Sequence, residues 1–146
     1  MRLMERLAPL FPLHQVDSMV ALLSKMNCQA QFAHTDYSPK ALAGVTDDMV
    51  PLACIVALAD GTAFDVWPGA IRFDTSRMFK HLQIKLRRGD VLIFRGDLVH
   101  GRAAVGDVEN VRIHAYLDVI GMERPKHIDG VEETHFMCDK TFIGKR

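Results

Sequence analysis

The sequence lacks any long apolar segment. Nowhere in its 146 residues does a stretch approach the roughly 18 consecutive apolar residues needed to cross a bilayer. The first eleven residues carry Arg2, Glu5 and Arg6 and contain Pro9, so they lack the uninterrupted apolar core of a secretory signal. We therefore expect neither a membrane span nor a secretory leader.

An excess of charge of one sign is also missing. The chain has 18 Lys and Arg against 18 Asp and Glu, a formal net charge of zero, and both signs are spread along it. It has no basic stripe of the kind that neutralises a phosphate backbone. Together with the missing apolar segment, this predicts no nucleic-acid partner and no membrane partner.

Cysteine is scarce. The only three are Cys28, Cys54 and Cys138, an odd number without the short paired spacing of a zinc or redox motif. This pattern favours free thiols in a reducing compartment. We accordingly expect a cytoplasmic protein.

What the sequence does contain is enough apolar material for a core. A hydrophobic content of 49% over this length fits a single domain spanning residues 1–146. Near the start, Leu3, Met4 and Leu7 have the spacing of a short helix, which Pro9 ends. The apolar residues of 16–26 fit one face of a helix or a buried strand equally well.

Short strands separated by Gly, Pro and Asp turns make up most of the remainder. Alternation or apolar runs predict strands over residues 28–36, 52–58, 62–67, 82–87, 91–94, 98–100 and 111–120. Asp60-Gly61 between two of these runs is a strong signal for a β-hairpin. The tail from Gly121 is polar and weakly periodic, so we expect an extended cover there. The pattern predicts a mainly β fold, an antiparallel barrel or sandwich, with its core at about residues 28–120.

Three candidate metal ligands lie on these predicted strands. The period of two in a strand points His34 and Asp36 the same way, so both can reach one metal. His100 follows a later strand and turn. Two imidazoles and one carboxylate are the facial triad that holds non-haem Fe(II) and leaves positions open for substrate and oxygen. We therefore predict His34, Asp36 and His100 as the metal-binding and catalytic residues of an iron-dependent oxygenase.

A longer segment gives this triad a family resemblance. Residues 89–100, a turn, a buried strand, a second turn and His100, resemble the distal-histidine segment of the Fe(II)/2-oxoglutarate-dependent dioxygenases, which include prolyl hydroxylases and phytanoyl-CoA hydroxylase. The hairpin predicted at 59–69 resembles the superfamily's central hairpin, and the resemblance extends over roughly residues 29–119. It implies a double-stranded β-helix (jelly-roll, cupin-like) with a short N-terminal helical segment. Fe(II) as cofactor, 2-oxoglutarate as co-substrate, and a small-molecule or protein substrate follow from the same resemblance.

The resemblance also implies residues that hold the co-substrate. Arg112, on the strand after His100, stands where the superfamily grips the far carboxylate of 2-oxoglutarate, a task suited to a planar guanidinium. His114 stands where several branches carry Ser or Thr, and a neutral imidazole can still donate one hydrogen bond. Tyr37, next to the triad, is a further candidate for contact with co-substrate or substrate, or else a surface residue.

Other interpretations of the same residues remain open. A histidine bonded to a backbone carbonyl is the common fate of a single His34 or His100, and Asp36 could be a turn residue. Arg112 could pair with Asp118 or Glu109. For the whole chain, the alternatives are a non-catalytic, cupin-like module that binds a carboxylate or metal, and a dioxygenase that uses the same triad without a keto acid.

Overall fold

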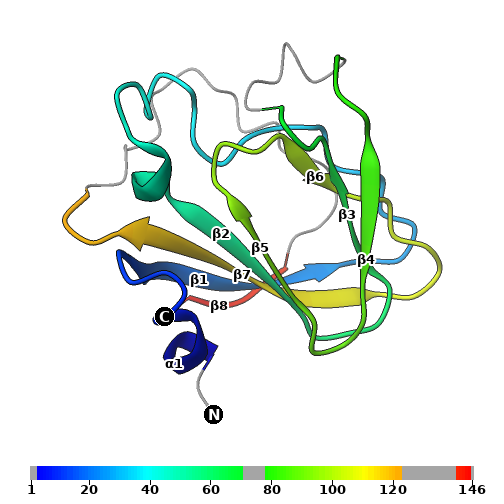
Figure 1. The fold of residues 1–146 in the computed structure, drawn as a ribbon. Helices are drawn as coiled ribbons and strands as arrows, with labels where there is room; N and C mark the ends of the chain where they lie inside the picture. The colour runs from blue at the N-terminus through cyan, green and yellow to red at the C-terminus, as the bar shows by residue number, and fades with distance from the viewer. Residues whose placement is uncertain (1–2, 71–77, 123–140, 146) are drawn as a thin grey trace.

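Two antiparallel β-sheets face each other in the computed structural model (Figure 1). The structure describes residues 3–70, 78–122 and 141–145. Its elements there are α1 (Leu3–Leu7), β1 (His14–Ser24), the 3-10 turn η1 (Asp47–Met49), β2 (Leu52–Ala57), β3 (Thr62–Val66), β4 (Leu82–Leu86), β5 (Val91–Arg95), β6 (His100–Arg102), β7 (Asn110–Val119) and β8 (Thr141–Lys145). The larger sheet has the order β5-β2-β7-β1-β8 and the smaller one β4-β3-β6. The predicted mainly β, double-stranded β-helix fold is confirmed, as is the short N-terminal helix.

The core lies between the two sheets, because alternate residues of each strand point inward. Its buried members are Ala53, Ile55, Ala57, Phe64, Val66, Leu86 and Phe94. Burying one such side chain contributes roughly 1.5–3 kcal/mol. The inward face of β7 continues this layer, since Ile55 is paired with His114 and Ala57 with Arg112 across β2 and β7. Polar side chains of β7 therefore point into the space between the sheets.

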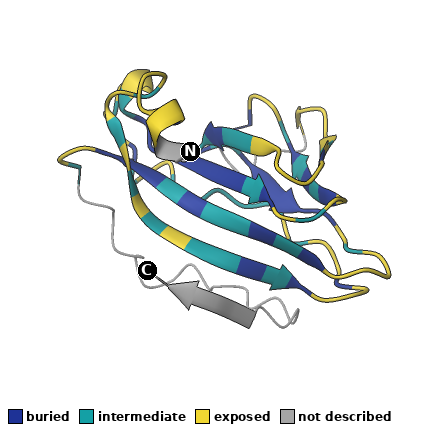
Figure 2. Cartoon of the chain, turned by 90° about the horizontal axis from the view of Figure 1, so that it is seen from below, coloured by how far each residue is buried: buried dark blue, intermediate teal, exposed yellow. Residues whose placement is uncertain are grey.

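A second cluster lies on the opposite face of the larger sheet. Leu7 of α1 packs there against Leu52, Cys54, Ala115 and Leu117. Figure 2 shows the alternation of buried and intermediate residues along β7, the central strand of this sheet. With both faces covered, β7 is held from each side and gives a firm base for the residues it carries.

The predicted hairpin at Asp60-Gly61 is wrong. Gly61 has the expected positive φ of 78°, but β2 pairs with β5 and β7, and β3 pairs with β4 and β6. The turn instead carries the chain from one sheet to the other, and Arg88 N–H donates to the Asp60 carboxylate at 2.8 Å. The dipeptide correctly predicts a turn. It does not predict that β2 and β3 lie in different sheets and pack their apolar faces against each other across the core.

The segment 28–36 is predicted as a strand but has only one isolated bridge, between His34 and His100. It nevertheless lies along β6. His34 and His100 exchange two backbone hydrogen bonds of 2.9 Å, and Gln31 N–H donates to Arg102 at 2.8 Å. The regular strand is therefore wrong, while the inward direction of His34 and Asp36 is as the alternation predicts.

Other elements differ in detail from the sequence predictions. The segment 16–26, which fitted either structure, lies in the strand β1, which precedes the predicted core yet pairs along its length with β7. The strand predicted at 98–100 begins only at His100. In the tail, β8 pairs with β1, and residues 123–140 lie outside the described part of the chain.

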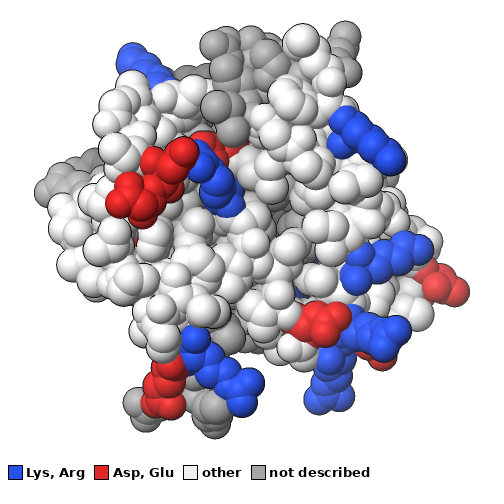
Figure 3. Space-filling model, viewed as in Figure 1, with Lys and Arg blue, Asp and Glu red and all other residues white. Residues whose placement is uncertain are grey.

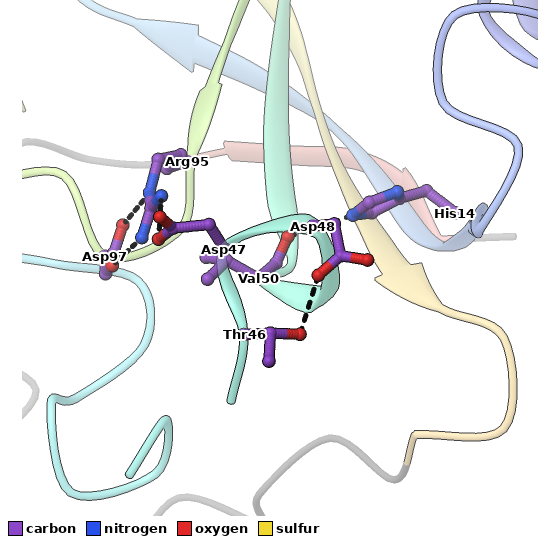
Figure 4. Close-up of polar contacts among 7 residues, drawn as sticks. All are labelled: His14, Thr46, Asp47, Asp48, Val50, Arg95 and Asp97. Atoms are coloured by element: carbon purple, nitrogen blue, oxygen red, sulfur yellow. Dashed lines mark hydrogen bonds and ion pairs between the residues drawn. The ribbon is translucent and has the colours of Figure 1, made fainter. Parts of the chain in front are cut away.

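The loop before β2 is tied to its neighbours by polar contacts (Figure 4). Arg95 donates two hydrogen bonds to Asp97, at 2.9 and 2.8 Å, and one to Asp47 at 2.8 Å. On the other side His14 Nε2 donates to the carbonyl of Val50 at 2.9 Å. Figure 3 shows basic and acidic side chains mixed over the face it displays. The absence of a nucleic-acid partner stays a prediction.

The cysteines differ from expectation. Cys54 is a buried free thiol, but Cys28 is disulfide-bonded, so the prediction of free thiols is wrong for Cys28. Cys138 lies outside the described residues. The argument for a reducing compartment loses the support of Cys28. No helix of the described ranges is long and apolar enough to span a membrane.

Candidate metal centre

The three predicted metal ligands converge. One ligand atom from each of His34, Asp36 and His100 lies within 4.8 Å of the others. Asp36 Oδ1 is 3.9 Å from His34 Nε2 and 3.7 Å from His100 Nε2. His34 and His100 are held side by side by the backbone bridge between segment 28–36 and β6. Residues far apart in sequence thus meet at one inward-facing point.

The backbone fixes which nitrogen each imidazole presents. His34 Nδ1 is 2.9 Å from the carbonyl of Phe32, and His100 Nδ1 is 2.9 Å from the carbonyl of Leu98. A carbonyl oxygen only accepts, so both Nδ1 atoms carry hydrogen and donate. In the neutral ring each Nε2 then has a lone pair, and both Nε2 atoms face Asp36. This orientation of a ligating histidine by its other nitrogen is typical of metal sites.

Two of the three candidate ligands are almost fully buried. The side chains of His100 and Asp36 are only 3% and 4% exposed, whereas that of His34 is 36% exposed. Burial lowers the pKa of His100 to about 4, against a smaller opposing effect of Asp36, so this imidazole is neutral at pH 7. For Asp36, burial raises the pKa, but the nearby imidazoles of His114, His100 and His34 together outweigh burial, so the pKa of this carboxyl lies below its usual value. A neutral imidazole and an ionised carboxylate are the forms that bind a metal.

Arg112 is a buried cation, and no described residue is its acidic partner. The residue is 3% exposed, its Nη1 donates to Ser24 Oγ at 2.7 Å, and its guanidinium lies 5.8 Å from the centre of the Phe64 ring. Burial lowers the pKa of Arg112 to about 10, with a further effect of Arg102. Among the described residues no carboxylate pairs with it, so the alternative of an ion pair with Asp118 or Glu109 is not observed. Its Nε also lacks a hydrogen-bond partner.

His114 approaches the centre from the other side of the carboxylate. Its Nε2 is 3.7 Å from Asp36 Oδ2, and its side chain is 14% exposed. Both atoms are buried and have no hydrogen-bond partner. The ring packs against Tyr116 with the centroids 4.5 Å apart. His114 therefore lies beside the candidate ligand Asp36, and its contact with a co-substrate stays a prediction.

These residues line one small cavity of about 100 Å³. Its walls are formed by Leu22, Gln31, His34, Asp36, Phe64, His100, Arg112, His114 and Tyr116. The volume is well below the roughly 300 Å³ at which pockets for drug-sized ligands begin. The cavity therefore suits a small, charged ligand beside the triad.

Tyr37 is not among the residues that line this cavity. It is 4% exposed and belongs to a core cluster with Leu42 and Val50, so it is not a surface residue. Its hydroxyl donates a hydrogen bond to the carboxylate of Asp118. Contact of Tyr37 with co-substrate or substrate stays a prediction, and the contacts observed here are structural ones.

Several residues that line the cavity are not among those predicted from the sequence. Leu22 lies on β1, whose structure the sequence left open, so its direction could not be predicted. Alternation predicts that Tyr116 shares the inward face of β7 with Arg112 and His114, but it assigns Tyr116 no role in the site. Gln31 is placed by the backbone bond of its N–H to Arg102, for which no local sequence signal exists.

Comparison with known proteins gives no match in sequence but clear matches in structure. No family profile and no curated protein matches the chain. AviO1 from Streptomyces viridochromogenes Tue57 matches with a TM-score of 0.66 and 13% identity, over 77% of this chain and 54% of that one. EctD from S. alaskensis with bound Fe matches with a TM-score of 0.60 and 14% identity, over 77% and 50%.

A third match is the epimerase SnoN in complex with Fe3+, alpha ketoglutarate and nogalamycin RO. Its TM-score is 0.55 at 20% identity, over 80% of this chain and 58% of that one. The chain thus spans about half the length of these structures. At such identities the likeness shows the fold alone. It confirms the resemblance to the Fe(II)/2-oxoglutarate-dependent enzymes at that level.

Proposed function

We propose that this chain is an Fe(II)- and 2-oxoglutarate-dependent dioxygenase that acts on a small molecule or a protein side chain. One observation carries the proposal. The Nε2 atoms of His34 and His100 face one buried carboxylate oxygen of Asp36, with both Nδ1–H groups already bonded to carbonyls. When both rings are neutral, their Nε2 lone pairs and the carboxylate repel one another, and a cation between the three atoms removes this repulsion. Two nitrogens and one oxygen are the donor set of the non-haem iron triad.

Arg112 supports the keto acid as co-substrate. A guanidinium removed from water is costly unless an anion pairs with it, and the described residues offer Arg112 only the hydroxyl of Ser24. A carboxylate arriving in the cavity could accept two parallel hydrogen bonds from the guanidinium. Arg112 lines the same cavity as the triad, which suits a short dicarboxylate whose other end reaches the metal.

The chain's own residues would bind, orient and shield the reactants. When bound, iron supplies the oxidising chemistry together with oxygen and the keto acid. Leu22 and Phe64 give the cavity apolar walls, which exclude water and strengthen each charged contact. Holding the reacting groups in fixed positions is the protein's main contribution in such enzymes. The matched structures of EctD with bound Fe and of SnoN with Fe3+ and alpha ketoglutarate agree with this proposal.

Succinate release from 2-oxoglutarate, measured anaerobically and in air with added Fe(II), tests the proposal. The protein should form succinate only in air, and His34→Ala should abolish it. Arg112→Leu should weaken 2-oxoglutarate binding by about 30-fold or more, the effect of removing one partner from a buried charge pair. Arg87→Leu is the matched control, since Arg87 is exposed at a turn. No succinate from well-folded, iron-loaded protein would contradict the assignment.

A non-catalytic carboxylate- or metal-binding module is the second candidate. The observation that favours it is the buried Arg112, because a buried guanidinium can bind a carboxylate ligand whether or not a reaction follows. Tight binding of 2-oxoglutarate and metal without any oxygen-dependent succinate, across a broad substrate panel, would identify this alternative.

A further inference from the structure

We infer that His114 is a positioning residue of the metal centre, whose Nε2–H donates to Asp36 Oδ2 and leaves Oδ1 alone to bind the metal. The inference rests on the proposed metal function and deepens it. It gives His114 a different task from the one that the family resemblance implies, which is contact with the co-substrate.

The two oxygens of Asp36 face different partners. Oδ1 is the oxygen near His34 and His100, at 3.9 and 3.7 Å. Oδ2 is the oxygen near His114, at 3.7 Å. Asp36 Oδ2 and His114 Nε2 are both buried, and both lack a hydrogen-bond partner. Two unsatisfied polar atoms that face each other in a dry site are expected to pair, because leaving each one unpaired costs about 1–3 kcal/mol.

His114 is close to the carboxylate but not part of the ligand cluster. The residues whose donor atoms lie within 4.8 Å of one another are His34, Asp36 and His100, without His114. This separation disfavours His114 as a fourth ligand. The gap of 3.7 Å is too long for a hydrogen bond, but a closer approach by less than about 1 Å would bring it to the usual 2.7–3.2 Å. Such tightening upon loading is common in sites whose geometry is loose when empty.

The position of His114 suits a residue that directs another one. It lies in the middle of β7, paired on one side with Val20 of β1 and on the other with Ile55 of β2. Its ring rests on Tyr116. Asp36, by contrast, lies in a segment without regular structure. A donor on the central strand can therefore fix a carboxylate whose own backbone offers less support, as partners of metal-bound carboxylates do.

The consequence for the centre concerns its open positions. If Asp36 binds the metal through Oδ1 alone, His34, Asp36 and His100 would supply three donor atoms and leave positions open for a keto acid and oxygen. If both oxygens of Asp36 bound the metal, one of these positions would be lost. By pairing with Oδ2, His114 would keep that position free.

Titration of the metal-free protein with Mn(II), without keto acid, tests this inference. Free Mn(II) is followed by electron paramagnetic resonance. His114→Leu, which removes the donor, should weaken Mn(II) binding by about 10–100-fold, as for other partners of metal ligands. His114→Gln, which keeps an amide N–H, should restore most of the affinity. His81→Leu removes an imidazole that is half exposed, just before β4, where it pairs with Asp65, and this variant should bind Mn(II) like the unchanged protein.

The outcomes separate this inference from the proposed function. If the unchanged protein binds no Mn(II), the metal function itself fails. If it binds Mn(II) but His114→Leu binds equally well, the inference alone is overturned. If electron spin echo spectra of the Mn(II) protein show three bound imidazoles that fall to two in His114→Gln, His114 is a ligand and the inference is also overturned. Two imidazoles in both proteins, with the loss and rescue above, support it.

Discussion

Which ring nitrogen each histidine presents decides whether the centre can bind a metal. Both Nδ1–H groups donate to the carbonyl two residues earlier in the chain, Phe32 for His34 and Leu98 for His100. The backbone therefore selects the same tautomer twice. From the sequence alone, a histidine bonded to a carbonyl is an alternative to a metal ligand. The structure combines the two, because the hydrogen bond from Nδ1–H to a carbonyl leaves Nε2 of the same ring to face Asp36 and a metal.

Cys54 gives a prediction at the residue scale. Burial raises the pKa of this free thiol to about 11, and the residue is 1% exposed on the α1 side of the larger sheet. The thiolate is the reactive form, so at pH 8 its fraction is about 100-fold smaller than for an ordinary thiol. Iodoacetamide should leave Cys54 unmodified in folded protein and alkylate it in guanidinium, as read from its peptide by mass spectrometry. Rapid alkylation of Cys54 in the folded protein would contradict the buried placement.

At the scale of elements, the centre depends on the contact of segment 28–36 with β6. Gly101 allows this contact, because a Cβ there would lie 2.9 Å from the carbonyl oxygen of Gln31 and 3.2 Å from that of Phe32. Both neighbours are backbone atoms, which cannot turn aside as a side chain can. A residue without a side chain is thus needed to keep His34 next to His100.

Gly101→Ala should therefore weaken metal binding without touching any ligand. We expect the segment to move away from β6, with a loss of stability of about 1–3 kcal/mol, the usual range for overpacking, and weaker Mn(II) binding. Gly106→Ala is the matched control, since its Cβ would meet nothing within 4 Å. Denaturant unfolding and Mn(II) titration of both variants provide the measurement. Equal behaviour of the two variants would show that the close approach is not required.

The elements also show what the sequence could and could not predict. Alternation correctly predicted the common direction of His34 and Asp36, and that of Arg112 and His114, because the side-chain period is a local property. The hairpin at Asp60-Gly61 failed because strand partners are chosen by burial across the core, which is not local. For the same reason the sequence could not predict that His114 Nε2 faces Asp36 Oδ2. This contact depends on how β7 and the irregular segment 28–36 are placed relative to each other.

For the molecule as a whole, stability and function share one interior. The apolar core between the sheets and the polar cavity lie side by side on the same inward faces, with Ile55 next to His114 across β2 and β7. Close packing of the apolar core holds the residues of the polar cavity in place.

Ile55→Ala tests this dependence. Ile55 is 1% exposed, so its truncation should lower the free energy of unfolding by about 2–5 kcal/mol. Ile120→Ala makes the same change at a side chain that is 59% exposed, and we expect an effect below about 1 kcal/mol there. Urea unfolding followed by circular dichroism compares them. Similar losses in the two variants would contradict the position of the core.

The most direct test of the account is the anomalous scattering of a crystal loaded with Mn(II) in the absence of oxygen. The account predicts one strong peak between the sheets, about 2.0–2.3 Å from His34 Nε2, His100 Nε2 and Asp36 Oδ1, with both Nδ1 atoms still on their carbonyls. A well-ordered crystal with these three side chains in place but no peak between them, or a peak bound elsewhere, would contradict it.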